Sequence, residues 1–143
     1  MIVIIVLGIA LVPLLMTYAN VANTGMQREA ITIATSLAQT LMEEIESKRY
    51  DENTAPPWSA TLGSETGETG RATYNDVDDF NGYSENPIPN FGGYSLSVSV
   101  SYVQPGDLET PVVGTTTDFK RIMVTVSHSK AGNVRLVSVR QPY

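Results

Sequence analysis

The first fifty residues, Met1–Tyr50, read MIVIIVLGIALVPLLMTYANVANTGMQREAITIATSLAQTLMEEIESKRY, and the rest of the chain is organised around them. Met1–Met16 contain no charged side chain, and the first charge in the sequence is Arg28. From Met26 the pattern becomes amphipathic and ends in several acids. We therefore expect one long helix in two parts, an apolar segment over residues 1–25 and an amphipathic segment over residues 26–50 that belongs to a globular head.

The apolar segment has the length of a membrane span or of a helix in a hydrophobic filament core. As a helix, Met1–Ala19 would rise roughly 28 Å, close to the ~30 Å thickness of bilayer hydrocarbon. A cleaved secretory signal would need basic residues before the run, and a buried core helix this apolar would need more protein around it. We expect Gly8 and Pro13 to bend or locally melt the helix, and Asn20–Gly25 to form a soft stretch after it.

Apolar side chains then recur every three or four residues, the spacing of a helix that buries one face. They are Met26, Ala30, Ile33, Ala34, Leu37, Leu41 and Ile45. We expect this face to lie on a sheet and the helix to close near Tyr50 and Asp51. A coiled coil is the alternative use of the same stripe, although about three and a half heptads are few for one.

The composition argues against several classes of protein. The chain has 143 residues, no cysteine and a formal net charge of −6, so it offers no disulfide framework, no thiolate metal site and little attraction for nucleic acid. The charge is uneven, because residues 41–92 hold eleven acids and three basic residues, whereas residues 93–143 hold three acids and five basic residues. The acidic middle and the basic end could attract each other within one subunit or between neighbours.

Residues 51–92 are predicted to be a long irregular connection, because proline and glycine interrupt them too often for any long element. Connections of this length usually form binding surfaces or stay mobile, and we expect Thr61–Arg71 to be the mobile tip. Aromatic residues indicate that other parts pack against the head. These residues are Trp58, Tyr74, Phe80, Tyr83 and Phe91.

Residues 93–143 are predicted to form an antiparallel sheet of at least three strands with one face on the helix, which makes the fold class α+β. Tyr94–Tyr102 alternates apolar residues with serine throughout. We expect a second strand over Phe119–Ser127, a hairpin at Ser129–Asn133 and a third strand over Val134–Val139. On the second strand we place Ile122, Val124 and Val126 inward and Lys120, Arg121 and Thr125 partly outward.

The sequence contains no recognisable catalytic constellation, so we predict no enzyme activity, no cofactor and no small-molecule substrate. The single histidine, His128, lies beside a predicted turn and is interpreted as an ordinary surface residue. Three acids of the helix, Glu43, Glu44 and Glu46, are interpreted as a solvated face or as partners of a neighbouring subunit.

The segment Asn75–Gly82 (NDVDDFNG) is the one cluster with cation chemistry to offer, since calcium takes several oxygen ligands from a flexible loop. The helix–loop–helix calcium pattern fails in either register, because Phe80 or Ile88 stands where a ligand is required. We favour an Asx-rich turn that caps backbone amides, and keep a looser calcium site as the alternative. The carboxylates of that alternative are Asp76, Asp78 and Asp79. No metal site is assigned from the sequence.

Four segments together resemble type IV pilins and pseudopilins, and most closely minor prepilins of the mannose-sensitive haemagglutinin (MSHA) type. They are Met1–Ala10 (MIVIIVLGIA), Leu37–Ile45 (LAQTLMEEI), Tyr74–Tyr83 (YNDVDDFNGY) and Asp118–Val126 (DFKRIMVTV). The resemblance implies a single-pass protein of the inner membrane with its head outside the cytoplasm, which later enters a pilus or secretion filament at the cell surface. Its implied partners are other pilin subunits, the pilus assembly machinery and, before assembly, membrane lipid.

That family has a basic leader ending in Gly, cleaved before an N-methylated residue, and a Glu a few residues later. Met1 aligns just past that Glu, so we expect either a start upstream of Met1 or a version that is not matured in the usual way. The alternative function, from another class, is a single-span membrane-anchored binding module whose acidic loop recognises calcium or a partner.

Overall fold

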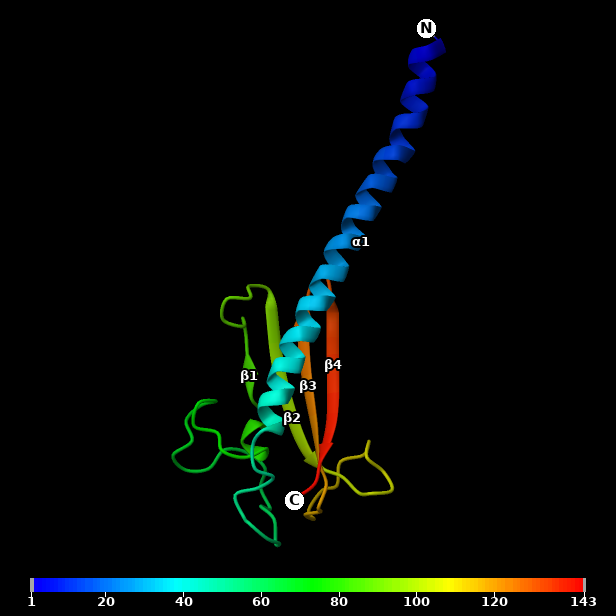
Figure 1. Ribbon diagram of the computed structural model, residues 1–143. Helices are drawn as coiled ribbons and strands as arrows, with labels where there is room; N and C mark the ends of the chain where they lie inside the picture. The colour runs from blue at the N-terminus through cyan, green and yellow to red at the C-terminus, as the bar shows by residue number, and fades with distance from the viewer. Residues whose placement is uncertain (1, 143) are drawn as a thin grey trace.

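A computed structural model of the chain describes the backbone of residues 2–142 and the side chains of residues 15–142. The elements follow in the order α1 (Ile2–Glu46), η1 (Asp78–Phe80), β1 (Ser84–Glu85), β2 (Tyr94–Tyr102), β3 (Lys120–His128) and β4 (Gly132–Arg140). The four strands form one antiparallel sheet in chain order. Figure 1 shows the second part of α1 lying across this sheet and the first part running on beyond it. The predicted α+β class is confirmed.

Helix α1 is continuous from Ile2 to Glu46. Its backbone stays helical through Pro13 and through Asn20–Gly25, so the expected local melting is not observed, and Figure 1 shows only a gentle curvature. The helix ends before Tyr50, where we had predicted its end. The Arg140 guanidinium of β4 donates hydrogen bonds to the carbonyl oxygens of Glu46 and Lys48, and these contacts satisfy carbonyls that the ending helix leaves without partners.

The predicted apolar segment Met1–Met16 lies almost entirely outside the described side chains, which begin at Leu15. Among the residues that are described, no helical segment has both the length and the hydropathy needed to cross a membrane. Residues 15–29 are exposed. Four large apolar side chains in this part of α1 are 60–76% exposed, namely Leu15, Met16, Tyr18 and Val21.

From Ala30 onward, α1 buries one face against β3 and β4. The buried side chains on this face are Ala30, Ala34, Ala38, Leu41, Met42 and Ile45. The predicted half-buried helix is therefore confirmed from Ala30 onward. Met26 is still 42% exposed, so the packed stripe begins one turn later than its apolar spacing indicated.

The sheet repeats the alternation of its sequence. β2 covers Tyr94–Tyr102 as predicted, with its apolar residues buried and its serines facing outward or partly covered. β3 pairs with β2 from Tyr94↔His128 to Tyr102↔Lys120, and with β4 from Lys120↔Arg140 to His128↔Gly132. β3 is therefore shifted by one residue from the predicted Phe119–Ser127, and β4 extends beyond the predicted Val134–Val139 at both ends. The short β1 adds a fourth strand at the free edge of β2.

The core lies between α1 and the inward face of the sheet, and the connection after α1 closes one side of it. Phe80 of η1 is fully buried in this core, and Trp58 is 7% exposed. Tyr74, Phe80 and Tyr83 pack edge to face, with ring centroids 5.0–6.1 Å apart. The predicted aromatic packing is confirmed, although Phe91 stays 40% exposed and contacts only the edge of the core through an edge-to-face pair with Tyr94, with ring centroids 6.5 Å apart.

Candidate functional site

A fully buried lysine lies at the start of β3. We had placed Lys120 partly outward, and this prediction was wrong, because its exposed fraction is 0%. Side chains alternate along a strand, so Lys120 faces the same way as Ile122, Val124 and Val126. The strand pattern would have identified its direction. The high cost of burying an unpaired ammonium is why an outward position looked more favourable.

The Lys120 ammonium has a complete set of acceptors. Its Nζ lies 2.7 Å from the carbonyl oxygen of Tyr50, 2.7 Å from Oδ2 of Asp51 and 2.5 Å from Oδ1 of Asp78. These three acceptors match the three hydrogens of the ammonium group. Nζ also lies 4.5 Å from the centroid of the Tyr50 ring and 5.6 Å from that of Tyr102. The charge is therefore both hydrogen-bonded and flanked by aromatic faces.

Asp51 links this lysine to the chain that leaves α1. Burial raises its pKa, but the Lys120 ammonium and the backbone N–H groups of Asn53 and Ser59 outweigh that effect and hold the pKa of Asp51 below its usual value. The Tyr102 hydroxyl lies 2.8 Å from the carbonyl oxygen of Ser59, to which it donates. Burial and the neighbouring acids raise the pKa of both Tyr50 and Tyr102, so both phenols stay neutral.

The acidic segment forms the Asx-rich turn that we favoured. Oδ1 of Asp76 accepts from the backbone N–H groups of Asp78 and Asp79, at 3.0 and 3.3 Å. Oδ2 of Asp79 accepts from the N–H groups of Asn75 and Asp76, at 2.7 and 3.0 Å. The turn leads into η1, and the bridge between Arg49 and Asp76 fixes it beside the end of α1. All three aspartates are almost fully buried, at 0–1% exposure.

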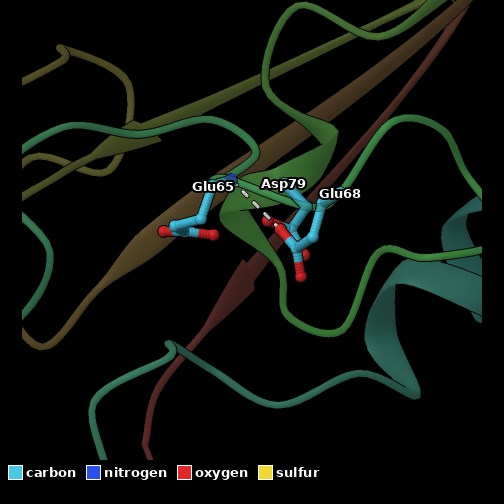
Figure 2. Close-up of side chains that lie close together, drawn as sticks. All are labelled: Glu65, Glu68 and Asp79. Atoms are coloured by element: carbon cyan, nitrogen blue, oxygen red, sulfur yellow. Dashed lines mark hydrogen bonds between the residues drawn. The ribbon is translucent and has the colours of Figure 1, made fainter.

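Two further acids, which our sequence analysis did not single out, join this turn from the preceding loop. Figure 2 shows Glu65 and Glu68 of that loop beside Asp79, together with the hydrogen bond that the Glu65 N–H donates to Oε2 of Glu68 at 3.1 Å. One carboxylate oxygen from each of these three residues lies within 4.8 Å of the others. The same holds for Glu65, Asp76 and Asp78. No local spacing could have found Glu65 and Glu68, because the fold brings them to the turn.

The crowding of these carboxylates changes their acidity. Burial, with the nearby charges of Asp78 and Asp79, raises the pKa of Asp76 to about 8. Partial desolvation of its carboxyl group and the closeness of the Glu68 and Asp79 carboxylates raise the pKa of Glu65 to about 7. Both residues therefore hold protons unusually tightly for carboxylic acids. In chemical terms the arrangement brings several carboxylate oxygens close together, which suits a cation.

The singled-out acids of α1 and His128 contact other parts of the chain, with the exception of Glu43. Glu44, predicted to be solvated or to pair with a neighbour, instead pairs with Arg71 of the same chain, and that hydrogen bond lowers the pKa of Glu44. Arg71 also contacts Glu85 at 3.2 Å, so this end of the predicted mobile tip is tied to α1 and to β1. Glu46 accepts a hydrogen bond from Ser138, whereas Glu43 is exposed. His128 stacks on Tyr94 with ring centroids 4.2 Å apart.

Comparison of the chain with models of protein families, with curated proteins and with solved structures finds no match.

Proposed function

We propose that the protein is a structural subunit, a minor pilin or pseudopilin, of a type IV-like pilus or secretion filament. The observation that carries this proposal is the contrast along α1. Residues 15–29 leave their apolar side chains exposed, whereas the same helix from Ala30 onward is packed on the sheet. A protruding helix with exposed apolar groups needs an apolar partner, and neighbouring helices of other subunits would supply one.

In this proposal the head and the protruding part of α1 do different work. The protruding part packs with other pilin subunits into the core of a filament, and membrane lipid covers it before assembly. The sheet and the connection over residues 51–92 face outward. The protein would therefore begin in the inner membrane with its head outside the cytoplasm and end at the cell surface. The proposed role is structural and involves no enzyme activity.

The alternative remains a membrane-anchored binding module with an acidic loop. The buried carboxylates around Asp76 and Asp79 favour it to the extent that they offer ligands for a cation. The two functions differ in what α1 contacts, because an anchor needs only lipid, whereas a filament subunit also needs other helices.

Shearing filaments from the cells that make this protein tests the proposal. We expect the wild-type protein to appear in the sheared fraction together with a major pilin. A Val21→Arg variant places a charge on the exposed apolar face of α1, and it should leave the head folded while lowering incorporation at least about tenfold. Val113→Arg is the matched control, because Val113 is 92% exposed on a loop of the head. Recovery of the wild-type protein from membranes alone would contradict the proposal.

A further inference from the structure

Among the described residues, three buried carboxylate oxygens have no hydrogen-bond partner. They are Oδ2 of Asp76, Oδ2 of Asp78 and Oδ1 of Asp79. Each aspartate uses its other oxygen, Asp76 and Asp79 for backbone N–H groups and Asp78 for Lys120. Burying a charged oxygen away from water without a partner is costly, so three in one turn indicate that something else satisfies them.

Lys120 does not supply this partner. Its three ammonium hydrogens are used by Tyr50, Asp51 and Asp78. Across the described part of the chain, Asp76, Asp79 and Glu65 form no ion pair with a basic side chain. Asp51 and Asp78 thus share the Lys120 ammonium, and the negative charge of Asp76 and Asp79 calls for a further cation.

The spacing of the carboxylates suits a calcium-sized ion. Calcium binds oxygen at ~2.3–2.6 Å, so two ligands on opposite sides of the ion lie roughly 5 Å apart. The two carboxylate groups described above meet this limit, since their ligand oxygens lie within 4.8 Å of one another. Glu65 belongs to both groups, so the groups adjoin at its carboxylate. Figure 2 shows three of these carboxylates, and Asp79 is the one contributed by η1.

We propose that these two adjoining carboxylate groups, Glu65–Asp76–Asp78 and Glu65–Glu68–Asp79, form a site for a divalent cation of the calcium class. The ligands are all carboxylate oxygens, which favours a hard cation over zinc or copper. They come from a loop and a turn of irregular geometry, which suits calcium better than magnesium with its strict octahedral shell. Once bound, the ion joins the loop that holds Glu65 and Glu68 to η1, and so fixes part of the connection after α1 onto the head.

Protons are the rival partners. The raised pKa values of Asp76 and Glu65 show that protonation can also relieve the crowding of these acids. Calcium and protons then compete for the same oxygens, so a calcium titration is best made at about pH 8, where fewer protons remain bound. The proposal does not depend on filament assembly, and its test needs only the purified protein.

The test uses the full chain in detergent micelles, freed of metal with a chelator and titrated with calcium chloride in a calorimeter. We expect saturable binding with a dissociation constant of roughly 10⁻⁵–10⁻³ M. Thermal unfolding in about 5 mM calcium should show a melting temperature higher by about 5 °C or more. Magnesium chloride in the same titration should bind at least about tenfold more weakly.

Two variants identify the ligands. Glu65→Gln keeps the shape of an exposed side chain, and Asp79→Asn removes one buried charge. Each should weaken calcium binding at least about tenfold, by loss of one charged ligand. Glu109→Gln is the matched control, because the Glu109 side chain is 89% exposed and lies outside the cluster, and it should bind like the wild type.

Three outcomes would overturn the proposal. Absence of both binding heat and a thermal shift in about 5 mM calcium would show that protons alone satisfy these oxygens. Wild-type affinity in Glu65→Gln would place any calcium elsewhere, and this variant gives an answer even if Asp79→Asn fails to fold. Equal affinity for magnesium would remove the assignment to the calcium class.

Discussion

The inward face of β3 passes through two kinds of buried environment. Ile122, Val124 and Val126 lie beneath α1 among other apolar side chains, and Lys120 lies on the same face at the start of the strand. All four are 0% exposed. The apolar part is stabilised by burial alone, which has no preferred direction. The charged part is stabilised only if Asp51 and Asp78 arrive at hydrogen-bonding distance, so it depends on the connection after α1.

The difference shows why the irregular connection is not a passive loop. An apolar side chain at the start of β3 would need only other apolar groups packed over it, whereas a buried ammonium needs hydrogen-bond acceptors in defined positions. The connection supplies Asp51 from its beginning and Asp78 from η1. The lysine therefore selects one path for a long chain segment that contains little regular secondary structure of its own.

The largest expected effect comes from removing that lysine. Lys120→Met leaves Asp51 and Asp78 buried without their cation and should lower the free energy of unfolding by about 3–5 kcal/mol. Urea unfolding of the full chain in micelles measures it. Lys130→Met, at an exposed position of the β3–β4 hairpin, is the control and should change stability by less than about 0.5 kcal/mol. If both variants were equally stable, Lys120 would not organise the connection.

A cavity in the apolar core should have a somewhat smaller effect. Leu41→Ala removes a side chain that is 1% exposed and should cost about 3 kcal/mol, through lost burial and the cavity left behind. Ile31→Ala on the exposed side of α1 is the control, at 39% exposure, and should cost well under half as much. Equal losses in the two variants would mean that α1 does not pack on the sheet through this face.

Lowering the pH should change the stability contributed by the charged part of the β3 face and leave the contribution of its apolar part unchanged. Asp51 has a lowered pKa in the folded protein, so its contribution to stability is present above its unfolded pKa of about 4 and is lost as the pH falls through the lower folded value. Lys120, the Tyr102 hydroxyl and the N–H groups of Asn53 and Ser59 face this carboxylate, and Asp78 shares the lysine with it.

Urea unfolding at about pH 5 and about pH 3 measures this effect. Wild-type protein and Leu41→Ala should change stability in parallel between these two pH values, because an apolar side chain does not titrate. The change on going to about pH 3 should be about 1 kcal/mol more favourable in Asp51→Asn, because this variant lacks the carboxylate whose contribution acid removes. An unchanged pH dependence in Asp51→Asn would show that the Lys120 contact does not depend on the charge of Asp51.

The smallest effect is expected at the partly exposed ion pairs of Arg71. Its side chain is 32% exposed, and those of Glu44 and Glu85 are 30% and 17% exposed, so solvent screens the charges. Arg71→Gln should therefore lower the free energy of unfolding by less than about 1 kcal/mol. It should nevertheless speed proteolytic cleavage within residues 61–71, compared with an Arg135→Gln control on β4. Unchanged cleavage would mean that Arg71 does not restrain this loop.

Much of the head could be predicted because its elements have strong periods. The alternation in Tyr94–Tyr102 identified β2 to the residue, and the spacing from Ala30 to Ile45 identified the packed face of α1. The prediction for Lys120 was wrong although its place in the alternation points inward, because an unpaired buried ammonium is costly and the local sequence does not show the acceptors that the fold supplies. The Asx turn at Asp76 was predicted correctly from its residue types.

Other features depend on residues that are distant in the sequence. The helix ends at Glu46 with a contact from Arg140, and the oxygens around Asp79 include those of Glu65 and Glu68. Such pairings leave no local pattern, since their partners lie on different elements and meet only after the chain has folded. The same is true of the four-strand sheet, because β1 is too short to show a period.

The sequence by itself determined the α+β class, the long helix with its packed and unpacked parts, and the strands of the meander. These follow from side-chain period and backbone preference, which act over a few residues. Only the tertiary structure decided which charged side chains are buried and which partners they contact. Burial makes an isolated charge costly, so Lys120 and the crowded carboxylates are explained by the partners that the fold brings to them from distant parts of the chain.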